Sequence, residues 1–408
     1  NYDRIDLHRP YVDNIVLVNA AGKPMYRETD LIDVWFDSGS MPYAQLHYPF
    51  EGEMARGTEA DRQAMIHSDY EGTPIPPAYF PADFINEGVD QTRGWFFTLH
   101  AIATMIFDSV AFKNVISTGL VLDAKGNKMS KHVGNVTNPF EMMEKYGADP
   151  VRFYMMTNSE PWDNLKFDPE GVDEVRRKFF GTLYNTYSFL ALYANVDGFD
   201  PETMLNQGNL AERPEIDRWI ISKANSLIIN VCKQLNDYDP TRAGRLIDNF
   251  VNDDLSNWYV RLNRKRFWGK EMDSDKLNAY QTLYSCLMTV AKLVAPFAPF
   301  YADRLYHDLG GKMESVHLES YPMADTEAID AELEARMDIA QKITSMTLAL
   351  RRKVNIKVRQ PLAQLMIPAI DDKQKQRICA VKDLIKNEVN VKEVNFVENS
   401  GFLVKKVK

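Results

Sequence analysis

Apolar positions divide the chain into two parts with different periods, and the change falls at about residue 170. Before that point short apolar runs alternate with turn residues, a pattern that predicts short strands and loops, including a strand at residues 34–36. Beyond it apolar residues recur three and four positions apart, which predicts long amphipathic helices. The clearest helical series cover residues 175–190, 216–235 and 277–294, and Pro296 and Pro299 end the last of them.

The first part predicts two strands, each followed by a helix. Residues 79–85 form the first predicted strand, and Asp90 is the expected N-cap of a helix that extends to residue 107. This helix is apolar on nearly every side, so we expect it to be buried. Residues 115–122 form the second predicted strand and residues 139–146 the second helix. The alternation predicts an α/β layer with a parallel sheet.

The pattern changes again towards the C-terminus. There it predicts a helix, a strand, a second helix and a second strand, at residues 329–352, 362–367, 373–387 and 391–397. Three domains follow: an α/β domain at residues 1–165, an all-α helix bundle at 166–325 and a small α+β segment at 326–408. Residues 197–214, which contain Gly, Pro and Asn, are the expected linker between bundle helices.

Composition limits the classes of partner. The chain has 408 residues, 45% of them hydrophobic, which suffices for two or three domains with their own cores. Its net charge of -9 means that a nucleic acid would have to meet local basic patches. No apolar stretch is long enough for a bilayer and no signal peptide opens the chain, so we expect a cytoplasmic protein without a membrane partner. Both ends fall within ordinary strand-like sequence, so we also expect a fragment.

Metal and disulfide chemistry finds no support in the sequence. Cys232, Cys286 and Cys379 are far apart and form no Cys-x-x-Cys pair. The histidines have no metal-ligand spacing, and no nucleophile lies beside a base in a pattern typical of covalent catalysis. We therefore predict no metal site, and in particular no protein-bound zinc.

The densest chemistry lies in residues 123–133, DAKGNKMSKHV, which we call the lysine loop. Gly126 and Asn127 favour a turn directly after a predicted strand. The loop also supplies three ammonium groups, those of Lys125, Lys128 and Lys131. Such groups can neutralise the charge that builds on pyrophosphate as it leaves the α-phosphate of a nucleotide. A solvated turn is the alternative, but lysines grouped around a glycine after a buried strand favour phosphate binding.

A second polar segment, residues 87–91, follows the first predicted strand, with residues 86–88 as a turn. Gly88 lets a ligand approach the backbone, and the carboxylates of Glu87 and Asp90 suit ribose hydroxyls or an ammonium group. Gln91 adds an amide. Asp90 as a plain N-cap is the alternative. Ligands of parallel sheets lie beyond the carboxyl ends of the strands, so we expect this segment and the lysine loop to share one sheet edge and one ligand.

Two tryptophans and two basic runs complete the candidates. Trp35 and Trp95 lie beside the polar segments and could line a pocket for an aliphatic side chain, although a place in the core is the usual one. A basic run near residue 261 offers phosphate contacts and a stacking surface on a helix, with Trp258 on the same face. Its members are Arg261, Arg264, Lys265, Arg266 and Trp268. Residues 351–359 form a second run, and a solvated face is the alternative for both.

Several of these segments resemble one enzyme family. KMSKH at 128–132 resembles the KMSKS signature of class I aminoacyl-tRNA synthetases, and residues 87–103 resemble the adenylate-binding segment of their isoleucyl, valyl and leucyl branch. WFDSGS at 35–40 is similar to the segment that re-enters the catalytic fold after the editing insertion. DLHRPYVDNI at 6–15 and NIKVRQPL at 355–362 are most similar to the isoleucyl members. The resemblance spans essentially the whole chain.

The resemblance implies an ATP-dependent ligase that attaches L-isoleucine to tRNA(Ile) through isoleucyl adenylate, with Mg²⁺ accompanying ATP. It implies that Lys128 and Lys131 stabilise the phosphates, and that the adenylate lies against Glu87, Gly88, Asp90, Gln91 and Lys131. Trp35 and Trp95 would wall the amino-acid pocket. The α/β domain would be part of a Rossmann-like nucleotide-binding domain, the bundle would bind the anticodon, and the protein would be a monomer.

Two departures from the family pattern stand out. His132 occupies the position of the final Ser of the signature, and no His-x-Gly-His occurs in the sequence, so we expect this fragment to lack the other half of the ATP site and the editing region. The fragment alone should then be inactive. A valyl or leucyl enzyme, or a non-catalytic RNA-binding module, is the alternative.

Overall fold

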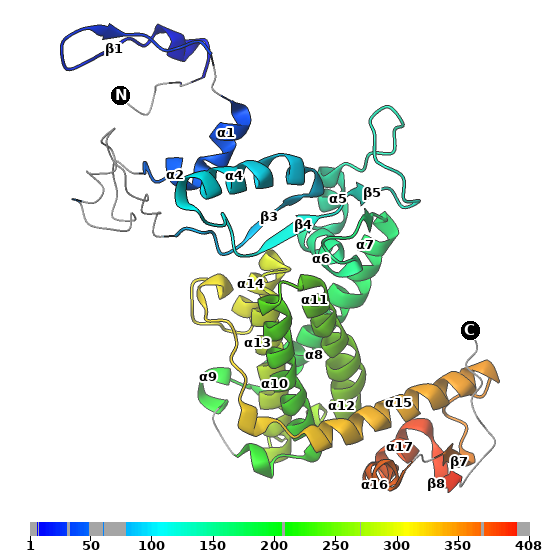
Figure 1. Ribbon diagram of the computed structural model, residues 1–408. Helices are drawn as coiled ribbons and strands as arrows, with labels where there is room; N and C mark the ends of the chain where they lie inside the picture. The colour runs from blue at the N-terminus through cyan, green and yellow to red at the C-terminus, as the bar shows by residue number, and fades with distance from the viewer. Residues whose placement is uncertain are drawn as a thin grey trace. The chain divides into compact units, whose positions relative to one another are not determined.

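The computed structural model describes residues 6, 8–30, 33–48, 60, 79–205, 209–269, 271–368 and 371–397. The chain forms two compact units, Asn1–Leu120 and Val121–Lys408, and each is described by itself. No helix among the described residues is long and apolar enough to cross a membrane. Figure 1 labels the elements.

Among its described residues the first unit contains the 3₁₀ turn Tyr11–Asn14, a short hairpin, a parallel strand pair and the helical segments named below. The hairpin strands are β1 (Leu17–Val18) and β2 (Pro24–Met25), and the parallel pair is β3 (Ile85–Gly88) and β4 (Val115–Thr118). The helical segments are α1 (Val34–Gly39), α2 (Met41–Ala44), the 3₁₀ helix η3 (Val89–Arg93) and α4 (Trp95–Phe107). Leu99, Ile102 and Phe107 of α4 form the core with Tyr43 and Phe80.

Four predictions for the first unit are wrong in detail. Residues 34–36 begin a helix, because the Asp33 carboxylate accepts hydrogen bonds from the backbone N–H groups of Trp35 and Phe36. The predicted turn at 86–88 is part of β3, so the strand lies later than residues 79–85. Asp90 lies inside η3 and does not cap α4. Nor is α4 buried on all sides, since Phe97 is 63% and Met105 77% exposed.

The second unit begins with a parallel strand pair and three helices. The strands are β5 (Val121–Leu122) and β6 (Leu165–Lys166), and the helices are α5 (Pro139–Tyr146), α6 (Ala148–Asn158) and α7 (Pro169–Val175). The helix predicted at 139–146 is confirmed. The strand predicted at 115–122 is in fact two strands, β4 and β5, which belong to different two-stranded sheets among the described residues. The single sheet expected to carry both polar segments is therefore wrong.

The helix bundle follows, and it confirms the helices predicted at 216–235 and 277–294. Helix α7 continues through a π-helical stretch (Arg176–Phe180) into α8. A second π-helical stretch (Phe250–Val260) joins α11 to α12. The α-helices are α8 (Gly181–Asp197), α9 (Pro201–Met204), α10 (Glu215–Asn236), α11 (Pro240–Asn249), α12 (Arg261–Phe267), α13 (Ser274–Val294) and α14 (Pro299–Asp308). Short 3₁₀ helices occupy Leu210–Glu212, Val316–Leu318 and Thr326–Ala328.

Buried aromatic residues hold the bundle together. Trp219 on α10, Tyr280 on α13 and Phe297 before α14 are almost completely inaccessible. Aspartates fix where the helices begin: Asp239 accepts a hydrogen bond from the N–H of Arg242 at the start of α11, and Asp273 accepts one from Lys276 at the start of α13. The bundle is thus stabilised by one continuous apolar core.

Helix α6 is fastened to the bundle at the corner between α13 and α14. The Asp149 carboxylate accepts a hydrogen bond of 2.6 Å from the backbone N–H of Tyr301 on α14. The Arg152 guanidinium donates to the carbonyl oxygens of Phe297 (3.3 Å) and Pro296 (3.2 Å). The short helices after the lysine loop and the bundle therefore form one connected body.

The C-terminal segment is the small α+β element that the sequence predicts. Its elements are α15 (Ala331–Lys353), β7 (Leu362–Pro368), α16 (Asp372–Ala380), α17 (Lys382–Val389) and β8 (Val391–Val397), and β7 pairs with β8 in parallel. The single helix predicted at 373–387 is interrupted at Val381, whose backbone leaves the helical conformation. β8 has the predicted bounds.

Candidate functional site

The lysine loop is built on the carboxylate of Asp123. One carboxylate oxygen accepts hydrogen bonds from the backbone N–H groups of Lys125 (3.0 Å) and Asn127 (2.7 Å). The N–H of Gly126 donates to the Asp123 carbonyl oxygen (2.8 Å), and Gly126 has a φ of +88°, which favours glycine. Hydrogen bonds from the Asn135 side chain and from Asn127 lower the pKa of Asp123 to about 2. The carboxylate is therefore ionised at neutral pH and organises the turn.

Asn135 closes the base of the loop from the other side. Its amide oxygen accepts a hydrogen bond of 2.8 Å from the N–H of Ser130, and its amide nitrogen donates to Asp123 Oδ2 (3.0 Å) and to the carbonyl oxygen of Lys128 (3.2 Å). The sequence analysis missed both Asp123 and Asn135. Asp123 lies three positions before Gly126, a spacing that is typical of an Asx turn, and this spacing could have pointed to Asp123.

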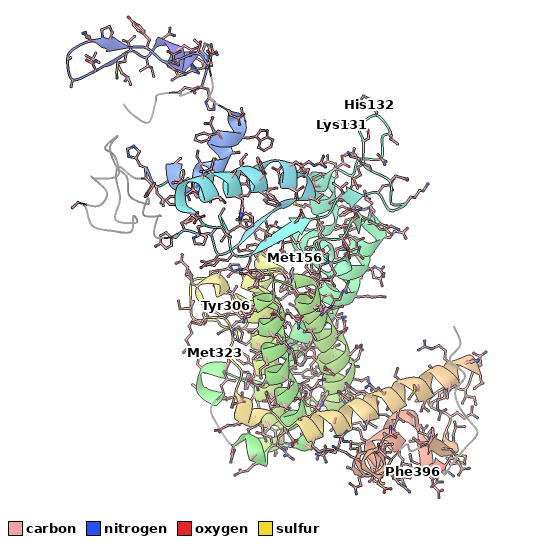
Figure 2. All side chains as sticks on the ribbon, in the orientation of Figure 1. Lys131, His132, Met156, Tyr306, Met323 and Phe396 are labelled. Carbon is pink, nitrogen blue, oxygen red and sulfur yellow. The ribbon has the colours of Figure 1, made fainter. Side chains whose placement is uncertain are left out.

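The lysines themselves extend into solvent. Met129 packs with the cluster formed by Val151, Tyr154, Leu165 and their neighbours, so the loop has one apolar anchor. Lys125, Lys128 and Lys131 are all exposed. Figure 2 shows Lys131 and His132 at the far end of the loop, beyond β5 and α5. The geometry is thus a fixed base that presents a cationic tip.

The segment 87–91 forms the end of β3 and the following 3₁₀ helix in the first unit. The side chain of Gln91 accepts a hydrogen bond of 3.0 Å from the backbone N–H of Trp95 and donates to Asp90 at 3.3 Å. Gln91 therefore has the capping role that was predicted for Asp90. The carboxylates of Glu87 and Asp90 are exposed, and a Cβ at Gly88 would lie 2.7 Å from Asp90 Oδ1. The backbone N–H of Gly88 donates to the Glu87 carboxylate (3.3 Å), so both carboxylates lie against this glycine and a side chain at position 88 would have no room.

The two candidate tryptophans lie where α1 meets η3 and α4. Trp95 Nε1 donates to the carbonyl oxygen of Ser38 (3.0 Å), and the ring of Trp35 lies against Gly94. Trp95 also lines a cavity of about 260 Å³ with Met41, Tyr79, Ile85, Leu99 and Ala111 among others. Trp35 does not line this cavity and is 48% exposed. Of the two rings, that of Trp95 lines this described cavity, whereas that of Trp35 lies against Gly94.

The basic run at residues 261–268 divides into exposed and engaged side chains. Arg264, Lys265 and Trp268 are exposed. Arg261 forms an ion pair of 2.5 Å with Glu388 and lies over the ring of Trp258. Trp258 is buried, so the stacking surface that was expected of it is wrong. Three side chains of the run are thus available to a partner.

Arg266 has a different environment from its neighbours. Its guanidinium donates to both oxygens of the fully buried Asp217 (2.7 and 2.8 Å) and to Asp275. The hydroxyl of Tyr259 also donates to Asp217 (2.7 Å), and burial raises the pKa of this tyrosine well above its usual value. The hydrogen-bonding capacity of Arg266 is therefore used inside the bundle.

The second basic run is organised by a buried arginine. The Arg351 guanidinium donates to four backbone carbonyl oxygens, those of Lys357, Gln360, Val389 and Asn390. It thereby joins α15, the loop after it and the end of α17. Arg352, Lys353, Lys357 and Arg359 remain exposed.

Metal ligands do not gather in the described part of the chain. No group of three His, Cys, Asp or Glu side chains that could hold an ion occurs among the described residues. Cys286 is buried, and burial raises the pKa of its thiol, as it does for Cys232.

Two family models match the chain. One, described as tRNA synthetases class I (I, L, M and V), matches residues 3–168, and the other, described as the anticodon-binding domain of tRNA ligase, matches residues 217–367. The chain therefore belongs to the class I tRNA synthetases, and the Rossmann-like catalytic part followed by an anticodon-binding bundle is confirmed.

Within that class its relatives are isoleucine–tRNA ligases, as the sequence predicted. The enzyme of Bacteroides thetaiotaomicron is 64% identical over 414 residues, and that of Porphyromonas gingivalis 62% identical over 409 residues. Each alignment covers 100% of this chain and 34% of the relative, so the chain spans about a third of the length of the relatives it matches.

A solved structure supports the fold. It is the ternary complex of Agrobacterium radiobacter K84 agnB2 LeuRS with tRNA and LeuAMS, which has a TM-score of 0.52 and 20% sequence identity. The match covers 78% of this chain and 36% of that one.

Proposed function

We propose that this chain is the part of an isoleucine–tRNA ligase that stabilises the phosphates of ATP and binds tRNA(Ile). The observation that carries the proposal is the lysine loop, in which Asp123 and Asn135 fix the base while Lys128 and Lys131 stay exposed. A loop of this kind supports transfer at a nucleotide's α-phosphate, because its cations can meet the charge of the leaving group. The relatives' name supports isoleucine over valine or leucine.

The reaction has two steps. An oxygen of the isoleucine carboxylate attacks the α-phosphorus of ATP, the bond to the β-phosphate oxygen breaks, and pyrophosphate leaves with its electron pair. A hydroxyl of the terminal ribose of tRNA then attacks the carbonyl carbon, and AMP leaves. Lys128 and Lys131 stabilise the phosphate oxygens in the first step, when ATP enters with Mg²⁺.

The first unit has its own candidate groups for the adenylate and the amino acid. The adenylate is held by Gly88 and Gln91 together with the exposed carboxylates of Glu87 and Asp90, which suit ribose hydroxyls and the substrate ammonium. The apolar cavity lined by Trp95 supports an aliphatic side chain there, and Trp35 lies against Gly94, the residue before Trp95. These assignments rest on each segment's own geometry.

The bundle binds the RNA. Two exposed cations, Arg264 and Lys265, lie on α12, and the exposed ring of Trp268 lies at its end. The cations suit RNA phosphates, and the ring suits stacking of an unpaired base. Arg261 lies on the same run but must leave its ion pair with Glu388 to contribute, and Arg266 is better explained as a structural residue. We place the protein in the cytoplasm, where its tRNA and its other substrates are found. We expect it to be a monomer.

The test uses the full-length protein and isoleucine-dependent exchange of pyrophosphate into ATP. Lys131→Ala should reduce the exchange rate strongly without changing the unfolding midpoint, and Lys233→Ala, an exposed lysine on α10, is the matched control. Exchange that depends on valine or leucine would move the proposal to another member of the branch. An unchanged rate in Lys131→Ala would refute the role of the loop, and tRNA binding with no exchange at all would favour a non-catalytic RNA-binding module.

A further inference from the structure

A fourth lysine lies in register with the lysine loop. Leu122, the last residue of β5, pairs with Lys166 of β6 in parallel and with Lys128 of the loop in an isolated antiparallel bridge. Residues paired across neighbouring strands direct their side chains to the same face, and adjacent strands lie about 4.8 Å apart. Lys128 and Lys166 therefore share one face on either side of Leu122, and both are exposed.

The side chain of Lys166 leans over the turn of the loop. A Cβ placed on Gly126 would lie 3.2 Å from Lys166 Cε, 3.7 Å from Nζ and 3.9 Å from Cδ. Its aliphatic stem thus covers the one loop position that has no side chain of its own, and the ammonium group lies at the turn between Lys125 and Lys128.

The backbone of Lys166 is held from several directions. Its carbonyl oxygen accepts a hydrogen bond of 3.1 Å from the Tyr154 hydroxyl, and the next residue, Phe167, donates from its N–H to the Leu122 carbonyl oxygen (2.9 Å). Leu165 and Phe167 are both buried on either side of it. Lys166 is therefore anchored in the body of the unit, whereas Lys131 lies at the tip of the loop.

The charge of Lys166 also lacks a carboxylate partner in the part of the chain that the structure describes. The carboxylate of Asp123 is the acidic group of the turn, and it is hydrogen-bonded to Asn127 and Asn135 and to the backbone of Lys125. A cation held in place and left unpaired beside a phosphate loop is suited to an anionic ligand, because no competing ion pair must be broken before it binds.

We propose that Lys166 is a fixed cation of the phosphate site, which contacts an oxygen of the ATP phosphates or of the departing pyrophosphate beside Lys128. This inference rests on the proposed function of the lysine loop. The site would then combine a cation on β6, whose backbone is held by strand pairing and the Tyr154 hydroxyl, with the cations of the loop.

The experiment separates the effect of the Lys166 charge from that of its aliphatic stem, in the full-length protein. Lys166→Met keeps the apolar stem over Gly126 but removes the charge, and Lys166→Arg keeps the charge. The KM for ATP in isoleucine-dependent pyrophosphate exchange should rise roughly tenfold or more in Lys166→Met, as expected for the loss of a hydrogen bond to a charged group, and Lys166→Arg should restore most of it. Lys233→Met is the charge control, and unfolding midpoints are measured for all variants.

Each outcome separates the two proposals. A KM within twofold of wild type for Lys166→Met, while Lys131→Ala is impaired, would overturn the role of Lys166 and leave the loop's function standing. Equal losses in Lys166→Met and Lys166→Arg with lowered unfolding midpoints would make Lys166 a structural residue only and would also overturn the proposal. Unchanged exchange in both Lys166→Met and Lys131→Ala would refute the proposed function itself.

Discussion

Arg266→Met tests whether one arginine of the basic run is structural while its neighbour is not. Arg266 forms a bidentate ion pair with Asp217, in which the two N–O distances are 2.7 and 2.8 Å. The side chain of Asp217 is 0% exposed and that of Arg266 only 14%. The substitution leaves a buried carboxylate with the Tyr259 hydroxyl as its remaining side-chain donor among the described contacts.

The expected loss of stability follows from this burial. Removing one partner of a buried ion pair typically costs about 3–5 kcal/mol, because the other charge remains uncompensated. The second partner, Asp275, is half exposed and adds about 1 kcal/mol at most. With a urea dependence of about 1–3 kcal/mol per molar, the unfolding midpoint should fall by about 1 M or more.

The assay is urea unfolding followed by far-ultraviolet circular dichroism, with Arg264→Met as the control on the same helix. Arg264 is exposed, so its loss should change stability by about 0.5 kcal/mol or less. Asp217→Asn should cost less in the Arg266→Met background than alone, since both changes remove the same pair. Equal midpoints for Arg264→Met and Arg266→Met would refute the reasoning.

Three further predictions concern the loop, the first unit and the RNA. Hydrogen bonds lower the pKa of Asp123 from 3.8 to about 2, so the stabilisation that its carboxylate gives the turn is complete above pH 4 and is lost as the pH falls from 3.8 towards 2. The NMR signals of the Asn135 side-chain amide should shift in that window, and constant signals would contradict the prediction. Gly39→Ala should destabilise the first unit by about 1–3 kcal/mol in thermal unfolding, since a Cβ there would lie 2.9 Å from Thr98, whereas Gly269→Ala, with nothing within 4 Å, should not. Replacing both Arg264 and Lys265 by Glu should weaken tRNA binding and reduce the slope of log affinity against log salt by about two; an unchanged slope would exclude these side chains from phosphate contact.

The sequence predicted the elements whose apolar pattern is one-sided and long. Helix α10 buries one face over many turns and α13 is buried on most sides, but in both the apolar residues recur three and four positions apart over many turns, so the period is distinctive; β8 directly follows Asn390, which ends α17. A three-residue run such as Val34 to Phe36 fits either a strand or a helix, and the capping carboxylate of Asp33 decides for the helix. This signal is local, because Asp33 directly precedes the run.

Long-range partners explain most of what the sequence could not show at the candidate site. Arg264 and Arg266 look alike along the chain, and only the position of Asp217 on another helix makes one of them structural. The same is true of Arg351, whose four carbonyl partners come from two separate segments, the loop after α15 and the end of α17. Lys166 likewise reaches the lysine loop only through the pairing of β5 with β6. No spacing within the sequence contains this information.

The attachment of α6 to the bundle has a consequence for how the lysine loop can move. Asp149 and Arg152 bind the backbone at the corner of α13 and α14, and β5 is fixed by its pairing with β6. Both ends of the loop are therefore tied to the same body, and any hinge must lie within residues 123–138. The distance over which Lys131 can move is then limited by the length of this segment. The free-energy cost of fixing Lys131 in one position is chiefly the conformational entropy lost by residues 123–138.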